Sequence, residues 1–560
     1  MPAPAAEPES AKDGPVKHPP ADKKFHTSGL IRLTRPQMFA TMTGLLLAVL
    51  LAALDQTIIG TAEPRIINQL SGFDRYPWVS TTYLLTSTLA VPIFAKLSDM
   101  YGRKWFFLGG AIVFILTSAL CGASGTLTFL PIDGMNQLIV FRGLQGIGGG
   151  MMMGLAFTII GDVFSPAERG KYTSFFAATW GIASIFGPTL GGWLTDHISW
   201  RACFYVNLPV GLIAIATIYF YFPDLHPEGV QRKLDWAGVF SLILCIAPLL
   251  LALTWVTDYG WGSPRVESLL VLSAIMLAVF LRAETRAIEP LIPLALFRDP
   301  IVSLCSICVF LLGMGMFGVI IYLPLFMQGV LGVTATQSGN LLTPLMMGAV
   351  AGSVVTGQLT LRLQSYKIAA VSGSVLVAAG MILFARMNGA TRWIDVVIAM
   401  VIGGMGMGLL QPVYTVAVQN VAPRKYMGAA TASTAFFRSI GSTMGVAIFG
   451  SVLLTSYHDD LVSGIPSSTP ASALKLFANP LRLGQMRDRL VQTFGQFPDG
   501  MHLMQKLLAN VRTGLLHGLQ HIFFASAVIM SLAIILHLLL RDVPLRHFQP
   551  AEHQPEIPVA

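Results

Sequence analysis

Two side chains of opposite charge lie inside apolar stretches of this sequence and are the residues best placed to do chemistry. Asp55, in Leu54-Asp55-Gln56, lies about 17 residues into the first apolar run, which at 1.5 Å per residue is ~25 Å from one membrane surface. Arg142 enters the fourth run from the other surface and lies ~9 Å deep. A charge near the bilayer centre costs roughly 3 kcal/mol on insertion scales, so each needs a reason to be there.

Because the two depths are measured from opposite surfaces, both side chains fall in the same half of the membrane at similar levels. This predicts that they influence each other. Burial disfavours an ionised carboxyl and a nearby guanidinium favours it, so Asp55 is a candidate for taking up and releasing protons as Arg142 moves. A structural hydrogen bond is the alternative for Asp55. For Arg142 the alternative is that its side chain extends only to the membrane surface.

Two more ionisable residues are candidates for coupling or substrate binding. Glu63 precedes Pro64 near the end of the first run, where a solvated helix end is the expected explanation and a second acidic site is the alternative. Arg438 lies about ten residues into the thirteenth run, near the midplane. No carboxylate of the second half is placed to pair with it, so backbone carbonyls, a water-filled cavity or an acidic substrate group all remain open.

Two short motifs concern movement of helices. Ala95-Lys96-Leu97-Ser98-Asp99-Met100-Tyr101-Gly102-Arg103-Lys104 forms a charged loop, in which Asp99 can pair with arginine and latch an inner gate; a loop that only sets topology is the alternative. The fifth run contains Gly187-Pro188-Thr189-Leu190-Gly191-Gly192. Missing side chains and a missing backbone donor permit close packing and a bend at this point.

The sequence lacks the residues that nucleotide, metal, cofactor or disulfide chemistry would need. The glycines at 146–150 follow no strand and precede no Lys-Ser/Thr pair, so nucleotide binding is poorly supported, and no ATP-hydrolysing motif occurs. We expect no cofactor, no metal ion and no catalytic residue, which leaves a gradient as the energy source. The five cysteines fall in or beside apolar segments and form no disulfide framework.

The elements that position these residues are predicted to be membrane-spanning helices. Hydrophobic residues make up 54% of the chain and charged residues 11%, against roughly a quarter charged in soluble domains. The net charge of +8 is spread over short loops, so we expect membrane lipids and no nucleic acid as partners. The spans are predicted at 38–62, 79–95, 105–125, 137–160, 172–194, 204–222, 236–256, 266–281, 301–327, 338–358, 367–385, 394–416, 429–456 and 513–540.

The loops predict orientation and domains. Even-numbered short loops hold fourteen Lys and Arg residues against six in the odd-numbered ones, which places both termini in the cytoplasm. The predicted parts are a disordered segment 1–37, a six-helix bundle 38–222, two additional helices 236–281, a second six-helix bundle 301–540 and a tail 541–560. Within the second bundle, 457–511 is predicted as a long outer loop with short amphipathic surface helices at 471–491 and 500–511.

The chain also repeats itself. A shift of 258 positions places Gly146, Gly148 and Gly150 on Gly404, Gly406 and Gly408, and Gly187 on Gly445. One offset therefore relates the fourth and fifth runs to the twelfth and thirteenth. Two homologous halves with two inserted helices would produce this, and transporters built in this way bind substrate near the midplane between the halves.

Together these motifs resemble the major facilitator superfamily, and within it the fourteen-helix drug:proton antiporters. The likeness covers roughly 38–540: Lys96 to Lys104 is similar to the family's G-x-L-x-D-x-x-G-R-K loop, the Asp55 and Arg142 segments resemble its first-helix and fourth-helix motifs, and Gly187-Pro188 resembles its antiporter motif. Trp200-Arg201-Ala-Cys-Phe204-Tyr-Val-Asn207-Leu-Pro209-Val-Gly211 resembles a signature of the fourteen-helix subgroup. Glu63 departs from the pattern, because a small or apolar residue is usual there.

The resemblance implies an all-α membrane protein of major facilitator fold in a bacterial inner membrane. It implies export of hydrophobic or amphipathic compounds by proton antiport and alternating access. Lipids are an alternative cargo, and delivery to a periplasmic adaptor that docks on 457–511 is an alternative role. A membrane enzyme is disfavoured, because the sequence lacks a zinc motif, a Ser/His pair and paired intramembrane aspartates.

Overall fold

The computed structural model describes residues 34–541 except for a set of short gaps. The gaps are 130, 165, 225–234, 288–289, 364, 423–426, 464, 466–476, 478–479, 481–482, 484–486 and 496–499. Most of the segment 1–37 predicted to be disordered, nearly all of the tail 541–560 and most of the predicted surface helix 471–491 therefore lie outside the described residues. Residues 35–37 are helical, because α1 begins at Arg35, so the prediction of disorder is wrong for them. Within the described part of the chain, every regular element is helical.

The first bundle contains the helices of the N-terminal half. They are α1 (Arg35–Leu70), η1 (Phe73–Arg75), α2 (Tyr76–Tyr101), α3 (Arg103–Gly122), α4 (Gly134–Val163), α5 (Pro166–His197), α6 (Ala202–Tyr205) and α7 (Asn207–Tyr221). Two further helices follow, α8 (Trp236–Tyr259) and α9 (Pro264–Arg286). The second bundle contains η2 (Leu294–Arg298), α10 (Pro300–Leu325), η3 (Phe326–Val330), α11 (Ala335–Leu363), α12 (Lys367–Ala385), α13 (Trp393–Val421), α14 (Met427–Val462), α16 (Arg487–Phe494) and α17 (Gly500–Leu539).

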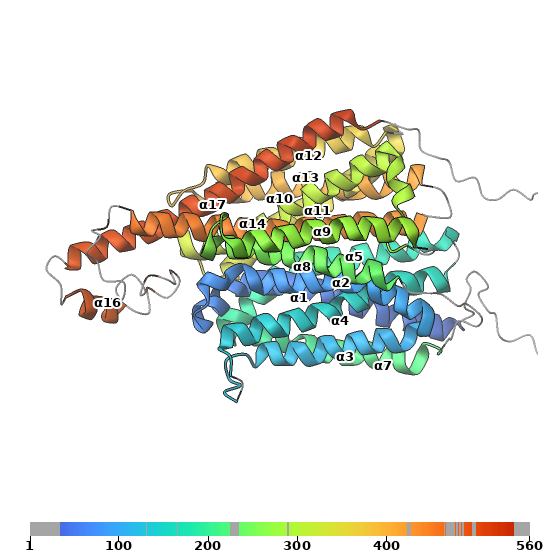
Figure 1. The fold of residues 1–560 in the computed structure, drawn as a ribbon, viewed down its shortest axis with the longest axis horizontal. Coiled ribbons are helices and arrows are strands. Elements are labelled where there is room, and N and C mark those ends of the chain that lie inside the picture. The colour runs from blue at the N-terminus through green and yellow to red at the C-terminus, as the bar shows by residue number, and fades with distance from the viewer. Residues whose placement is uncertain are drawn as a thin grey trace, which may run out of the picture.

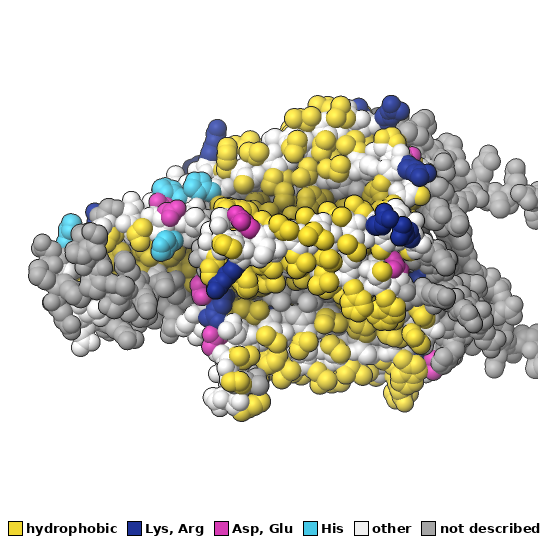
Figure 2. All heavy atoms as spheres, in the orientation of Figure 1, with side chains coloured by type: hydrophobic (Ala, Val, Ile, Leu, Met, Phe, Trp, Pro, Cys, Tyr) yellow, Lys and Arg dark blue, Asp and Glu magenta, His cyan; other side chains and the backbone are white. Residues whose placement is uncertain are grey.

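These helices are long because a lipid environment offers no partner for free backbone groups, so each span must bond its own. Thirteen helical stretches of the described chain are long and apolar enough to cross a membrane, with α6 and α7 counted as one. The fourteenth span is α5, a 32-residue helix in which glycine, serine and threonine lower the apolar content. On the face shown in Figure 2, hydrophobic side chains cover the length of the bundle and charged ones gather toward its two ends. The fourteen-helix prediction is confirmed.

The two bundles repeat the same arrangement. Shifted by 258 positions, α4 falls on 392–421, and α13 covers Trp393–Val421. Helix α4 packs against α2 and α3, as α13 packs against α11 and α12. Gly148 of α4 abuts the backbone of α3, and Gly406 of α13 abuts the backbone of α12. A side chain at either glycine would push the helices apart, so the repeat in sequence reflects a repeat in packing.

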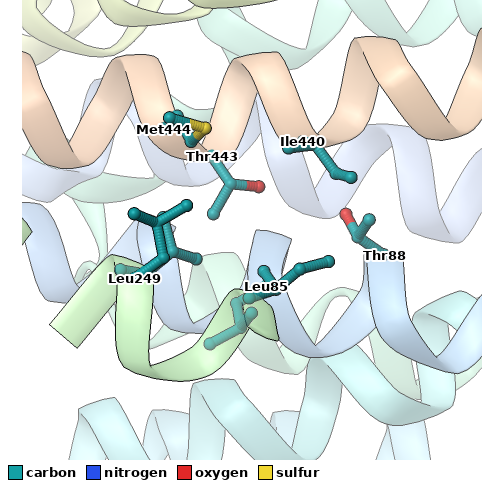
Figure 3. A pocket seen from close by; sticks show the side chains of 8 residues that line it. Leu85, Thr88, Leu249, Ile440, Thr443 and Met444 are labelled. Carbon is teal, nitrogen blue, oxygen red and sulfur yellow. The ribbon is translucent and has the colours of Figure 1, made fainter. Parts of the chain in front are cut away.

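The two additional helices cover a seam between the bundles. Helix α8 packs against α2 of the first bundle and α14 of the second, and α9 packs on α8. A small apolar pocket lies where α2, α8 and α14 meet (Figure 3), and its lining includes Leu85, Thr88, Leu249, Ile440, Thr443 and Met444. This lining holds no ionisable side chain, so the pocket serves packing and not proton chemistry.

Helices α14 and α17 project beyond the bundle at one end (Figure 1). They contain 36 and 40 residues, or ~54 and ~60 Å at 1.5 Å per residue, which exceeds the ~30 Å hydrocarbon core of a bilayer. Helix α16 packs on α17, and the Phe477 and Phe494 rings lie 5.8 Å apart. Residues 500–511, predicted as a separate surface helix, instead form the first turns of α17. We call the end of the bundle from which α14 and α17 project the extension end. The opposite end, where α1 begins and α17 ends, is called the termini end.

The bundles meet at the extension end. The rings of Tyr76 on α2 and Tyr322 on α10 stack at 5.5 Å, and the Tyr76 hydroxyl donates to the carbonyl of Ile321 at 3.4 Å. Asp196 at the end of α5 accepts hydrogen bonds from the backbone N–H and hydroxyl of Thr336 on α11, at 2.7 and 2.6 Å. These contacts close the extension end between the two bundles.

Candidate functional site

Asp55 lies at the centre of a buried polar cluster in the first bundle. Its side chain is fully buried on α1. One carboxylate oxygen accepts from Arg142 Nη1 at 2.5 Å, and the other accepts from Gln145 Nε2 at 2.8 Å and Asn207 Nδ2 at 3.0 Å. The donors come from α4 and α7, so one carboxylate joins three helices.

Arg142 is held by more than this ion pair. Its side chain is 2% exposed. Its Nη1 also donates to Gln145 Oε1 at 2.9 Å, its Nε donates to the carbonyl of Val79 at 3.4 Å, and the guanidinium lies 4.2 Å from the centre of the Tyr83 ring. A planar guanidinium can make these contacts together, whereas an ammonium group cannot reproduce the geometry. Because α2 supplies Val79 and Tyr83, the arginine links α4 to both α1 and α2.

Small residues let these helices approach closely. Gly146 of α4 lies against the backbone of Tyr83 on α2, and Gly150 lies against the backbone of Ser87. A methyl group at either position would collide with a carbonyl oxygen, which cannot move aside as a flexible side chain can. Asn207 opens α7 and also donates to Ser118 Oγ of α3 at 3.1 Å. The glycines therefore set the distance between α4 and α2, the helix whose Val79 and Tyr83 contact Arg142.

The cluster can change its charge in one way. A buried ion pair is stable only while both partners stay together, because separation leaves a desolvated charge. If α4 and α1 move apart, protonation of Asp55 removes the penalty at the carboxylate, and Asn207 of α7 can still bond the neutral carboxyl. The arrangement is suited to bind a proton in one conformation and to release it in another.

The structure brings together the two residues that depth arithmetic predicted to be neighbours. The alternative that Arg142 only reaches toward the membrane surface is wrong, because its side chain is buried and paired. Sequence reasoning missed Gln145 and Asn207. Gln145 lies one helical turn after Arg142, and that spacing was the available signal.

Glu63 was expected at a solvated helix end, and that expectation is wrong. Its side chain is fully buried, because α1 continues through Pro64 to Leu70 and the second bundle closes over it. Ser80 Oγ of α2 donates to its two oxygens at 3.1 and 3.3 Å. Glu63 is therefore not part of the Asp55 cluster but of the closed extension end.

Arg438 is half-buried on α14 and donates to Gln411 Oε1 of α13 at 2.9 Å. Within the described residues, no carboxylate oxygen lies within 4.0 Å of its nitrogens. The sequence left three kinds of partner open for Arg438, and the partner in the structure is a fourth kind, a neutral side-chain amide. Its role in coupling or substrate binding stays a prediction.

The charged loop after α2 is partly described. Gly102 adopts φ 103°, a backbone conformation that side chains rarely tolerate, and it separates α2 from α3. Arg103 Nη1 donates to Ser98 Oγ at 2.8 Å, and Lys104 Nζ lies 5.6 Å from the centre of the Tyr219 ring. The side chain of Asp99 lies outside the described residues, so its pairing as an inner-gate latch stays a prediction.

The glycine-proline segment of α5 joins the two bundles. Gly187 and Gly191 lie against Thr57 and Ile58 of α1, whereas Gly192 lies against Ala335 of α11. The Pro188 carbonyl accepts from Thr61 Oγ1 at 3.2 Å. One short segment therefore packs on both halves, which makes it sensitive to their relative movement.

Comparisons with known proteins agree with this geometry. The family model described as Major Facilitator Superfamily matches residues 45–446. The multidrug transporter protein MdtP of Bacillus subtilis is 36% identical over 530 residues, which cover 92% of this chain and 95% of that protein. Multidrug resistance protein 3 of Bacillus subtilis is 34% identical over 496 residues, which cover 88% of this chain and 93% of that protein.

Solved structures with low sequence identity share the fold. A bacterial homolog of the human lysosomal transporter Spinster, in an inward-facing and unoccupied conformation, superposes with a TM-score of 0.59 at 16% identity, covering 91% of this chain and 100% of that one. A D-xylose-proton symporter gives 0.53 at 14% identity, covering 88% and 97%. The family match over most of the chain, the fourteen long helices and the repeated bundles show that this multi-pass membrane protein belongs to the major facilitator superfamily.

Proposed function

We propose that this protein is a secondary active transporter that exports hydrophobic or amphipathic compounds in exchange for protons. The observation that carries the proposal is the buried Asp55–Arg142 pair, with its 2.5 Å contact and its uncharged donors Gln145 and Asn207. Two relatives of similar length bear the names of multidrug proteins, which supports drugs as the cargo.

In this proposal Asp55 carries the proton and Arg142 controls its release. The contact with Arg142 favours the ionised carboxylate, so a proton leaves when the pair forms and binds when it separates. Alternating access couples this exchange to the movement of the bundles, since a gradient drives export only if proton binding and substrate binding favour different conformations. We assign the extension end to the outer face of a bacterial inner membrane and the termini end to the cytoplasm.

The composition of the second bundle bears on the cargo. Arg438 is its one charged side chain near the midplane among the described residues, and it is bonded to a neutral amide. The sequence places no Asp or Glu near the middle of a span in this bundle, which suits neutral amphiphiles, lipids as well as drugs. A lipid cargo is therefore the second candidate. The extension formed by α14, α16 and α17 is the surface on which an adaptor would dock if cargo is handed on.

The test uses everted membrane vesicles that contain the protein and a pH-sensitive dye. Adding a transported compound should collapse part of the proton gradient, with cationic dyes, neutral drugs and lipids tested in parallel. Asp55→Asn should abolish the response at equal protein level. A wild-type protein that moves none of these compounds, or moves them with no effect on the gradient, would contradict the proposal. Co-purification of an adaptor would identify the handing-on role.

A further inference from the structure

A second buried carboxyl lies between the two bundles, separate from the Asp55 cluster. Glu63 is fully buried, and Ser80 is its hydrogen-bond donor at 3.1 Å. Within the described residues, no Lys, Arg or His nitrogen lies within 4.0 Å of its carboxylate. Burying a carboxylate with one neutral donor and no cation costs several kcal/mol, and a bound proton removes that penalty.

The burial of Glu63 depends on contact between the bundles. Two residues before it along α1, the Thr61 carbonyl accepts from Gln328 Nε2 of η3 at 3.0 Å. One turn from Ser80 along α2, Tyr76 stacks on Tyr322 of α10. Separation of the bundles at this end would break both contacts. Water would then reach the carboxyl, which lies seven residues, or ~10 Å, from the end of α1.

The ionisable groups around Glu63 do not neutralise it. Arg142 on α4 and the phenols of Tyr76 and Tyr322 are within electrostatic range, but Arg142 is already paired with Asp55. On the α5 and α6 side of α1, Asp196 is bonded to Thr336, and the Cys203 thiol contacts Thr195. None of these groups donates a hydrogen bond to Glu63 in the structure.

We propose that Glu63 is a second proton-binding carboxyl of the transport cycle, which must carry a proton for the bundles to close at the extension end. An ionised Glu63 favours the separated bundles, where water solvates it, and a protonated Glu63 favours the closed ones. Protons supplied from that side would then drive closure. This inference rests on the proposed alternating-access function but assigns a role that Asp55 does not have.

The experiment follows the extension end directly. Spin labels on cysteines introduced at Asp74 and Gln337, exposed positions on the two bundles, report the distance between them; the five native cysteines are buried and label poorly. The measurements are made in a protein that carries Asp55→Asn together with Arg142→Gln, so that the first carboxyl no longer titrates and its cation is not left unpaired near Glu63. The ratio of separated to closed molecules should rise by up to tenfold per pH unit, the slope expected for one proton.

Glu63→Gln in that background should remove the pH dependence and leave the closed distance at every pH, because the amide keeps the Ser80 hydrogen bond without a charge. Glu63→Asp should keep a pH dependence. That result would also show that the site tolerates substitution. The matched control is Glu284→Gln, which replaces a carboxyl that is 4% exposed, lies at the termini end of α9 and accepts from the backbone of Ile292. It should behave as its parent with Asp55→Asn and Arg142→Gln.

Two results would overturn the inference. One is a parent protein, with Asp55→Asn and Arg142→Gln, whose distances do not change with pH. The other is a pH dependence that survives Glu63→Gln at its full slope. Neither result would bear on Asp55 as the coupling carboxyl, because that role is tested by proton-linked export in the variants with and without Asp55. The two proposals can therefore fail separately.

Discussion

Replacing Arg142 by alanine tests the pairing at the centre of the site. The change removes the guanidinium that contacts Asp55 at 2.5 Å and leaves the carboxyl buried with Gln145 and Asn207 as its donors. Two neutral amides compensate a buried charge less well than a cation does. We therefore expect the carboxyl to hold its proton at neutral pH and the substrate to displace it poorly.

The magnitude follows from the contact. An opposite charge within ~4–6 Å stabilises an ionised carboxylate by the equivalent of about one to three pH units, and one unit corresponds to about 1.4 kcal/mol. The pH at which export is half-maximal should move toward alkaline values by that amount. Arg142→Lys keeps the charge but loses the bonds to Val79 and the ring contact with Tyr83, so its profile should shift less while its maximal rate falls.

The assay is the pH profile of export in proteoliposomes loaded at a fixed protein amount, with folding checked by detergent-solution chromatography. Arg75→Ala is the matched control, because Arg75 pairs with Asp133 at 2.9 Å outside the spans, with side chains 25% and 55% exposed. Partial burial raises the pKa of Asp133, but the backbone N–H of Asn136 and the Arg75 guanidinium outweigh it and hold that pKa below its usual value. A folded Arg142→Ala protein whose profile is lowered in height but unshifted would refute the electrostatic coupling.

Three further variants test other parts of the site and the packing. Asn207→Leu removes one neutral donor to Asp55, worth about 1 kcal/mol, so the export profile should shift toward alkaline pH by less than one unit; an unshifted profile would place Asn207 outside the coupling path. Gly191→Ala meets the backbone of Ile58 and should destabilise the protein by about 1–3 kcal/mol in thermal unfolding, whereas Gly357→Ala, with open space around it, should not. Equal melting temperatures would contradict this packing. Arg103→Ala should slow turnover with little change in substrate affinity at equal surface expression, and a wild-type rate would refute the gate role.

Helix positions and depth were predictable because they depend on apolar length and on a fixed rise per residue. Those two quantities were enough to bring Asp55 and Arg142 to one level. They could not identify Gln145 and Asn207, because burying an uncharged amide costs less than burying a charge. Such residues stand out only once a charged partner has been placed beside them. The remaining features of the site depend on contacts between helices that are distant in the sequence.

Glu63 shows the limit most clearly. A carboxylate beside a proline near the end of an apolar run is usually solvated, and the sequence does not reveal that α1 continues past Pro64 beneath the second bundle. Residues 500–511 are a second case, because the sequence predicted a separate surface helix there and the structure has one continuous helix. Lys506 and Arg512 interrupt the apolar pattern, but a helix that leaves the membrane does not need that pattern, so α17 is continuous.

The most direct test of the account is proton release by purified protein when substrate is added at neutral pH in weak buffer. The account predicts that the wild-type protein releases protons in proportion to the substrate bound. The folded Asp55→Asn variant, which lacks this carboxyl, should bind substrate without that release. A substrate-binding Asp55→Asn protein with undiminished proton release would contradict Asp55 as the coupling residue.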